Sequence, residues 1–204
     1  MPIAIVLRNN VSKNPFRDVI VSAIDSGIAD EALMCSGFFQ ENRGSTYCAT
    51  LEKGFAASCA RNKVNLITVG IHNSQWLASY KSFQKNLLSA GVNADCRYKV
   101  GTKWHAKVFI ALRAGQPLLG VIGSSNITRP AFSTSIPFNR ECDVIIWPEG
   151  SAHDALMNDA LGQGNFEDVV RAPYIPDQNG GITVETCLRN LYEEILDDDG
   201  LEEL

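Results

Sequence analysis

A histidine and a lysine, His105 and Lys107, stand one residue apart immediately before the apolar segment 108–112. Side chains alternate between the two faces of a strand, so both residues are expected on one face, about 6–7 Å apart along the strand. An imidazole can attack phosphorus, and an ammonium group can hold the non-bridging oxygens of a phosphodiester. The pair therefore predicts phosphoryl chemistry, although a lone histidine before an apolar strand is also typical of a packed core.

The next apolar segment, 118–122, ends in four small or polar residues: Gly123, Ser124, Ser125 and Asn126. A hairpin turn at 114–117 is expected to bring them back to the end of the sheet that carries His105. Hydroxyl, amide and backbone N–H groups here can donate to a phosphate, and a helix or turn beginning near Thr128 would add further donors. The same residues are also typical of a plain turn and helix cap.

Three more positions can contribute to this site. Glu141, just before the apolar segment 142–147, can accept a hydrogen bond from the second ring nitrogen of His105 and stabilise the charged ring. Arg129 and Arg140 flank the polar stretch and can bind phosphates. His72 follows an apolar strand and can line the same cleft. A simple ion pair for Glu141 and ordinary surface positions for the others are the alternatives.

His105-x-Lys107 followed by Gly123-Ser124-x-Asn126 resembles the active-site motif of the phospholipase D superfamily. The stretches Ser36-Gly37-Phe38-Phe39 and Asn139-Arg140-Glu141 resemble features of its nuclease-like members. Leu112 stands where the superfamily usually has an acidic residue, and the turn 113–117 is longer than usual. Both departures make the chain similar to the metal-independent restriction endonuclease branch.

The resemblance implies an α/β fold, a phospholipase D-like mixed β-sheet flanked by helices on both faces. It implies two copies of the motif in each active site, and because this chain has one copy, a homodimer is expected. His105 would form a phosphohistidine, and His105 of the partner subunit would act as general acid. Catalytic roles are expected for His105, Lys107, Ser124, Asn126 and Glu141, and substrate-binding roles for Gly123, Ser125, Arg129, Arg140 and His72. No metal and no cofactor are expected.

Apolar patterning predicts alternating strands and helices through the body of the chain. Strands are expected at 3–7, 32–39, 64–71, 92–100, 104–112, 118–122 and 142–147, and helices at 15–26, 47–62, 74–91 and 151–161. Residues 1–160 are expected to form the catalytic domain. Residues 161–204 are expected to form an irregular excursion over 162–182 and an acidic C-terminal helix packed on the domain or on the dimer mate.

The composition is that of a globular protein. Hydrophobic residues make up 45% of the 204 positions and charged residues 20%, and a chain of this length can bury a core without staples. No uncharged apolar run approaches the roughly 20 residues of a membrane span, so a soluble cytoplasmic protein is expected. The six cysteines lie at least eleven positions apart, which favours reduced thiols over a zinc cluster or a disulfide framework.

The net charge of −5 is distributed unevenly. Residues 1–150 carry 16 Lys and Arg against 10 Asp and Glu, whereas residues 151–204 carry 2 against 13. A basic body is compatible with a polyanionic partner. The acidic end is either a solvated surface or a competitor of nucleic acid for the basic cleft.

These observations predict a metal-independent phosphodiesterase that cleaves nucleic acid in a restriction-type defence role. DNA is expected as the substrate in preference to RNA. A partner protein is expected to supply target recognition. One alternative is a phospholipid hydrolase or transferase, but the chain shows no basic amphipathic helix for membrane docking. Another alternative is a non-catalytic subunit of a larger nucleic-acid complex.

Overall fold

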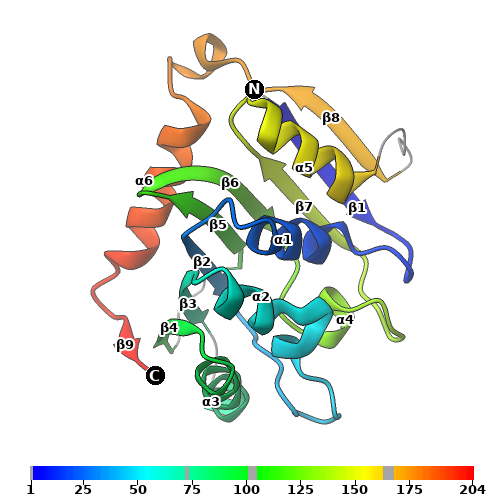
Figure 1. Ribbon diagram of the computed structural model, residues 1–204, viewed down its shortest axis with the longest axis vertical. Coiled ribbons are helices and arrows are strands. Elements are labelled where there is room, and N and C mark those ends of the chain that lie inside the picture. The colour runs from blue at the N-terminus through cyan, green and yellow to red at the C-terminus, as the bar shows by residue number, and fades with distance from the viewer. Residues whose placement is uncertain (1, 72–73, 101–104, 163–167) are drawn as a thin grey trace.

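The computed structural model describes residues 2–71, 74–100, 105–162 and 168–204. The described strands form one mixed sheet in the order β8-β1-β7-β6-β5-β2-β3-β4-β9 (Figure 1). Strands β2, β3 and β4 are parallel to one another, and the other neighbours pair antiparallel. The strands are β1 (Pro2–Arg8), β2 (Glu31–Ser36), β3 (Asn65–Ile71), β4 (Asn93–Lys99), β5 (Lys107–Arg113), β6 (Gln116–Gly123), β7 (Glu141–Ile146), β8 (Val169–Pro173) and β9 (Glu202–Glu203).

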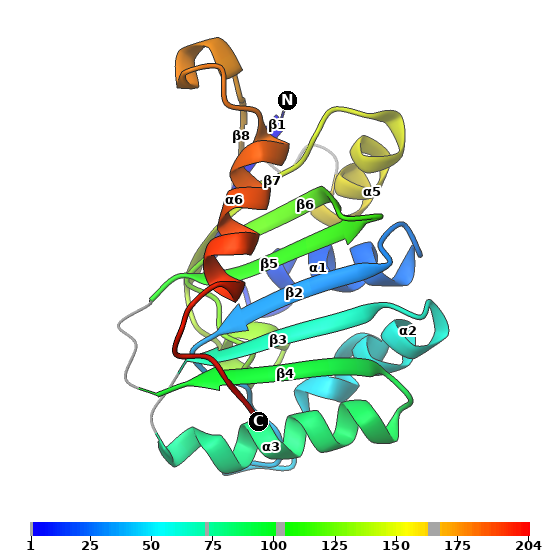
Figure 2. The same cartoon turned by 90° about the vertical axis from the view of Figure 1, so that its left-hand side faces the viewer.

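Helices cover both faces of the sheet, which confirms the expected fold class. Five of the described α-helices lie on one face and α6 crosses the other (Figure 2). The helices are α1 (Pro15–Asp25), α2 (Phe55–Arg61), α3 (Ser74–Ser89), α4 (Arg129–Phe132), α5 (Ser151–Leu161) and α6 (Val184–Leu196), with short 3₁₀ helices η1 (Ala49–Gly54) and η2 (Pro176–Asn179).

Strand β5 shows why the centre of the sheet is apolar throughout. Phe109 is fully buried under the five-helix face, whereas Val108 and Ile110 are buried under α6. A strand covered on both faces has no solvent-facing side chains, so its sequence is a continuous apolar run rather than an alternating one. The hairpin to β6 turns at Ala114 and Gly115, whose φ angles of 48° and 72° suit a two-residue turn.

Two expected elements are different in the structure. The helix predicted at 47–62 is divided into η1 and α2, because Lys53 and Gly54 adopt left-handed φ angles of 47° and 73°. The segment 162–182, expected to be irregular, contains β8, which pairs with β1 at the edge of the sheet. Pairing with a strand more than 150 residues away has no local sequence signal.

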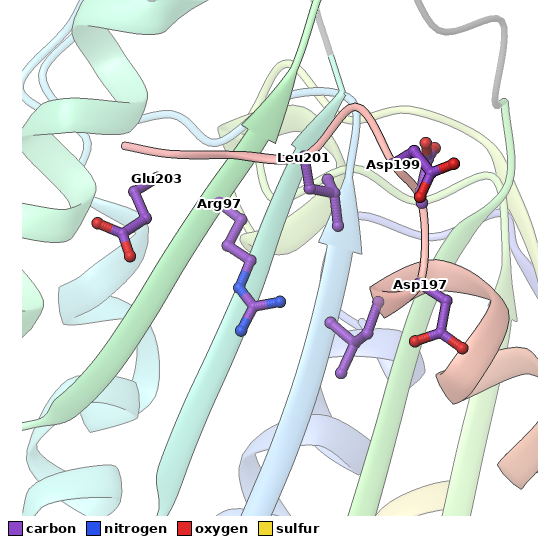
Figure 3. Close-up of a pocket in the computed structure, with 7 residues that line it drawn as sticks. Arg97, Asp197, Asp199, Leu201 and Glu203 are labelled. Atoms are coloured by element: carbon purple, nitrogen blue, oxygen red, sulfur yellow. The ribbon is translucent and has the colours of Figure 1, made fainter.

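The C-terminal segment lies on the α6 face and at the β4 edge. Val184, Leu188 and Ile195 of α6 are buried against the sheet. The chain then turns so that β9 pairs with β4, and Asp198 forms an ion pair with Lys99. Figure 3 shows this end of the chain around Arg97 of β4, in a pocket lined by Asp197, Asp198, Asp199, Glu203 and two leucines.

Within the described part of the chain, no helix combines the length and apolarity that a membrane crossing needs. All six cysteines are free thiols, and Cys35, Cys59 and Cys96 are buried.

Candidate active site

The candidate site lies where several strand ends meet on the face covered by the five helices. Lys107 at the start of β5 pairs with Gly123 at the end of β6, and Gly123 pairs with Asp143 of β7. Residues paired in this way carry their side chains on one face. Glu141, two positions before Asp143, lies on that face too. The register therefore gathers the two halves of the motif at one end of the sheet.

His105 and Lys107 form the entrance of this region. The strand expected from residue 104 begins only at Lys107, and Trp104 lies outside the described residues. His105 precedes the strand and is exposed. Lys107 is half-buried, and its Nζ donates to the carbonyl oxygen of His105 at 2.5 Å. His105 is therefore accessible to a substrate, and the Lys107 ammonium lies beside the backbone of His105.

Burial lowers the pKa of Lys107 from its ordinary value of 10.5, while the nearby Glu141, Cys35 and Asp143 act in the opposite direction. The pKa is lowered because the surrounding protein removes part of the hydration of the charged ammonium. A partly dehydrated cation interacts more strongly with an incoming phosphate than a fully hydrated one does.

Ser124 and Glu141 form a direct pair. Ser124 is exposed, and its Oγ donates to Glu141 Oε2 and accepts from the N–H of Cys142 at 3.1 Å. The carboxylate that was expected to receive a hydrogen bond from His105 thus has Ser124 as its partner in this structure. The pair fixes the hydroxyl of the motif at the edge of the site.

Ser125 points into the protein. It is completely buried, its Oγ donates to Asp143 Oδ2 at 2.6 Å, and its N–H donates to Asp143 Oδ1 at 3.2 Å. A side chain in this position cannot contact a substrate. Ser125 therefore does not have the expected binding role and instead holds the motif loop, residues 124–128, in place. Burial raises the pKa of Asp143.

The close packing of Asp143 against the end of β6 requires a glycine at position 123. A Cβ at this position would overlap Asp143 Oδ1 and would lie 2.6 Å from the carbonyl oxygen of Cys142. Real Cβ atoms do not approach a backbone oxygen so closely, so the glycine allows β6 and β7 to meet beneath the motif loop.

Asn126 is oriented by Ser36, the last residue of β2. Ser36 Oγ lies 3.2 Å from Asn126 Oδ1 and accepts from the N–H of Ile127 at 3.3 Å. Among the residues that the structure describes, none accepts from Asn126 Nδ2. The amide oxygen is therefore held, and the N–H₂ group remains available for a ligand oxygen.

Four of the backbone N–H groups around the motif donate within the protein. The N–H groups of Ser124, Ser125 and Ile127 donate to Cys142, Asp143 and Ser36, and the N–H of Arg129 donates to Gln40 Oε1 at 2.8 Å. Helix α4 has only four residues. The expected helix start near Thr128 is confirmed, but these backbone N–H groups donate within the protein. The side chains with a proton left to donate are Lys107 and Asn126, because the Ser124 hydroxyl donates to Glu141.

The flanking residues differ from one another in position. Arg129 donates to Ser135 Oγ at 3.0 Å and to the Ile136 carbonyl at 2.9 Å, so its guanidinium holds the following loop. Arg140 is exposed next to Glu141. His72 falls outside the described residues.

Three positioning residues were missed in the sequence. Asp143 holds Ser125, Ser36 holds Asn126, and Arg8 donates to the carbonyl oxygens of 130, 131 and 133 behind the motif loop. Asp143 had a usable signal, because it occupies an inward position of its strand together with Ile145 and Trp147. A carboxylate at such a position needs a buried partner.

No three His, Cys, Asp or Glu side chains of the described residues are arranged as a metal site. The side chains that the site presents are an accessible histidine, a partly dehydrated ammonium, a hydroxyl and an amide.

A mixed sheet with these motif residues at one end defines a phospholipase D-like domain. The family model described as the NgoFVII restriction endonuclease N-terminal PLD domain, where PLD is phospholipase D, matches residues 14–159. The chain belongs to this family. The match spans most of the chain and contains every motif residue from His105 to Glu141, and it confirms the superfamily resemblance.

No curated protein matches the chain. Among solved structures, NucT from Helicobacter pylori is similar with a TM-score of 0.48 and 16% identity, over 82% of this chain and 97% of NucT. The phosphatidylserine synthase of Haemophilus influenzae Rd KW20 gives a TM-score of 0.47 and 12% identity, over 98% of this chain and 45% of the synthase. The archaeal chromatin protein TrmBL2 gives 0.39 and 12%, over 77% and 51%.

Proposed function

We propose that this chain is a metal-independent endonuclease that cleaves a phosphodiester bond of nucleic acid, DNA ahead of RNA, through a phosphohistidine on His105. The observation that carries the proposal is the convergence of Lys107, Ser124 and Asn126 at one sheet end, beside an exposed His105, in a chain of a restriction endonuclease family. An accessible nucleophile beside an ammonium donor and an amide donor suits a phosphate.

In the first step, a ring nitrogen of His105 attacks phosphorus. The new P–N bond forms as the bond to the leaving sugar oxygen breaks, and that oxygen takes a proton from a second, protonated imidazole. Lys107 and Asn126 donate to the non-bridging oxygens, where negative charge increases in the transition state.

In the second step, the second imidazole, now neutral, removes a proton from water. The water oxygen attacks phosphorus and the P–N bond breaks, which releases a phosphate monoester and restores His105. Ser124, whose hydroxyl donates to Glu141 before substrate binds, borders the same phosphate. Every proton removed in one step is returned in the other, so no external acid is consumed.

The second imidazole is supplied by dimerisation. The chain has three histidines, and only His105 lies in the motif. A two-fold axis beside the exposed His105 would place His105 of the partner subunit across the same phosphate, because an isologous interface repeats each contact. Selection of the DNA target is expected to come from a partner protein that binds DNA specifically. A defence role would depend on that selection.

The direct test is trapping of the intermediate in EDTA. Wild-type protein is incubated with DNA labelled at an internal phosphate and quenched in alkali, and label on His105 is sought by peptide mass analysis. His105→Ala is expected to lose the label and at least about 10³-fold of the cleavage rate. His153→Ala, a histidine substitution on α5, is the matched control and keeps both. Cleavage that needs a divalent ion, or that survives in His105→Ala, would refute the proposal.

A further inference from the structure

A pocket of about 450 Å³ adjoins the candidate active site and is not used by the mechanism above. Its volume lies within the range of about 300–1,000 Å³ found for small organic ligands. Its walls come from the segment after β2, the start of α3, the motif loop and the segment before β7. They include Phe38, Gln40, Trp76, Asn126, Thr128 and Asn139.

One wall of the pocket is aromatic. The ring centroids of Phe38 and Trp76 are 4.8 Å apart, with 38° between the ring planes. The guanidinium carbon of Arg43 lies 4.6 Å from the centroid of the Trp76 ring, and Arg43 also donates to the carbonyl of Gln75. Aromatic side chains next to an arginine form a surface on which nucleobases stack.

The pocket is held open by polar contacts in its own wall. Gln40 Nε2 donates to the Arg43 carbonyl at 2.9 Å, and Gln40 Oε1 accepts from the N–H of Arg129 at 2.8 Å. These bonds join the loop that carries Arg43 to the start of α4. A ligand would therefore enter a formed site and would not need to order it first.

Asn126 connects the pocket to the catalytic residues. It lines the pocket, and it follows Gly123, the cross-strand neighbour of Lys107, by three residues, so its Cα lies within about 11 Å of the Cα of Gly123. A ligand that fills both places carries an anionic phosphodiester at Lys107 and a flat ring near Phe38 and Trp76. A nucleotide unit has this combination.

We infer that the pocket is a nucleobase subsite and that the enzyme acts on single-stranded nucleic acid. The inference rests on the proposed function, because the phosphate beside the base is the one to be cleaved. A base within a duplex is stacked and paired, and it reaches such a pocket only after both contacts are lost. A single strand offers unstacked bases without that cost.

The test compares ligands that differ only in their bases. Dissociation constants are measured by fluorescence anisotropy, at fixed salt and in the inactive His105→Ala protein, for a thymidine oligomer and for an abasic oligomer of equal length. The thymidine oligomer is expected to bind about tenfold or more tightly. Trp76→Ala and Phe38→Leu, each made in the same background, are expected to reduce this ratio to less than about threefold, because Leu retains apolar volume but not the ring.

Trp76→Phe retains a ring and is expected to restore the ratio, and Leu51→Ala, an exposed apolar position outside the pocket, is expected to leave it unchanged. A ratio near one in the parent protein, or a ratio that neither Trp76→Ala nor Phe38→Leu lowers, would overturn the inference. Tight binding of a duplex equal to that of the single strand would also overturn it. Cleavage by wild-type protein is measured separately, so failure of the proposed function is seen independently of base binding.

Discussion

Ser125 Oγ donates a 2.6 Å hydrogen bond to Asp143 Oδ2, and both side chains are shielded from solvent. The second residue of the Ser-Ser pair thus anchors the motif loop to β7, while the first, Ser124, faces the site. The two adjacent serines have different roles because Ser124 bonds Glu141 at the exposed start of β7, whereas Ser125 bonds the buried Asp143 two residues further along.

Replacing Asp143 by Ala is expected to destabilise the fold and impair cleavage. The change leaves the hydroxyl and the N–H of Ser125 buried without an acceptor, at about 1–3 kcal/mol for each group. Asp143→Asn keeps the shape and can still accept the N–H, so it is expected to retain much of the stability. Denaturant unfolding of both variants checks the prediction, and equal stability of Asp143→Ala and wild type would contradict it.

The same carboxyl predicts a pH dependence of stability. Burial raises the pKa of Asp143 above its ordinary value of 3.8. The folded state therefore binds this proton more tightly than the unfolded chain, and the free energy of unfolding contributed by Asp143 falls as pH rises from about 3.8 through the raised value. Asp143→Asn removes this contribution, so its difference in stability from wild type should change across that range and level off above it.

Lys107 is expected to set an alkaline limit on phosphate binding. Its pKa is lowered by burial, so the ammonium loses its proton at a pH below the ordinary 10.5. In the His105→Ala background, affinity for a short oligonucleotide should therefore decline below pH 10.5 as the charge is lost. Lys107→Arg in that background remains charged and should show no such decline. Identical pH profiles would show that Lys107 does not contact the phosphate.

A hybrid dimer tests whether the two histidines share one phosphate. Wild-type and His105→Ala chains are co-expressed with different tags, and the mixed dimer is purified on both. If one His105 attacks and the other protonates, the hybrid has no complete site and should retain less than about 1% of the wild-type rate. Half of the wild-type activity in the hybrid would instead indicate independent sites. The mixed dimer of wild type with His153→Ala is the control.

Arg8 is expected to be a structural residue of the loop behind the motif. It is 4% exposed, and its guanidinium donates to the carbonyls of Pro130, Ala131 and Ser133. A lysine cannot reach three acceptors in this planar arrangement, so Arg8→Lys should lose about 1.5–3 kcal/mol for each charged hydrogen bond that it fails to restore. Thermal unfolding measures the loss, and a melting temperature equal to wild type would exclude the role.

The acidic C-terminal end is expected to leave nucleic acid binding almost unchanged. Asp197, Asp199 and Glu203 lie around Arg97 on the α6 side, and β4 is three strand spacings, about 14 Å, from β5. At 0.15 M salt, charges are screened over about 8 Å. The combined substitution Asp197→Asn, Asp199→Asn and Glu203→Gln should therefore alter the dissociation constant for DNA less than about twofold. A larger gain would support competition between this end and the substrate.

The local pattern of the sequence was sufficient for most of the fold. A helix was predicted from residue 15, and α1 begins there, where Asn14 Oδ1 accepts from the N–H of Arg17 at 3.1 Å. Apolar runs marked the central strands, because strands buried on both faces carry no polar residues. These signals depend on neighbours within a few positions. The same logic failed at Lys53 and Gly54, where left-handed backbone divides a helix, and at β8, which exists only through its partner β1.

The sequence by itself determined which chemistry the chain carries, because His105, Lys107, Ser124 and Asn126 are reactive or donating groups wherever they lie. Only the tertiary structure decided what each group faces. It turned Ser125 inward to Asp143, directed the Ser124 hydroxyl to Glu141, and used four of the backbone N–H groups around the motif within the protein. Those outcomes depend on contacts between residues far apart in the chain, and the type of a side chain does not say which distant partner it will meet.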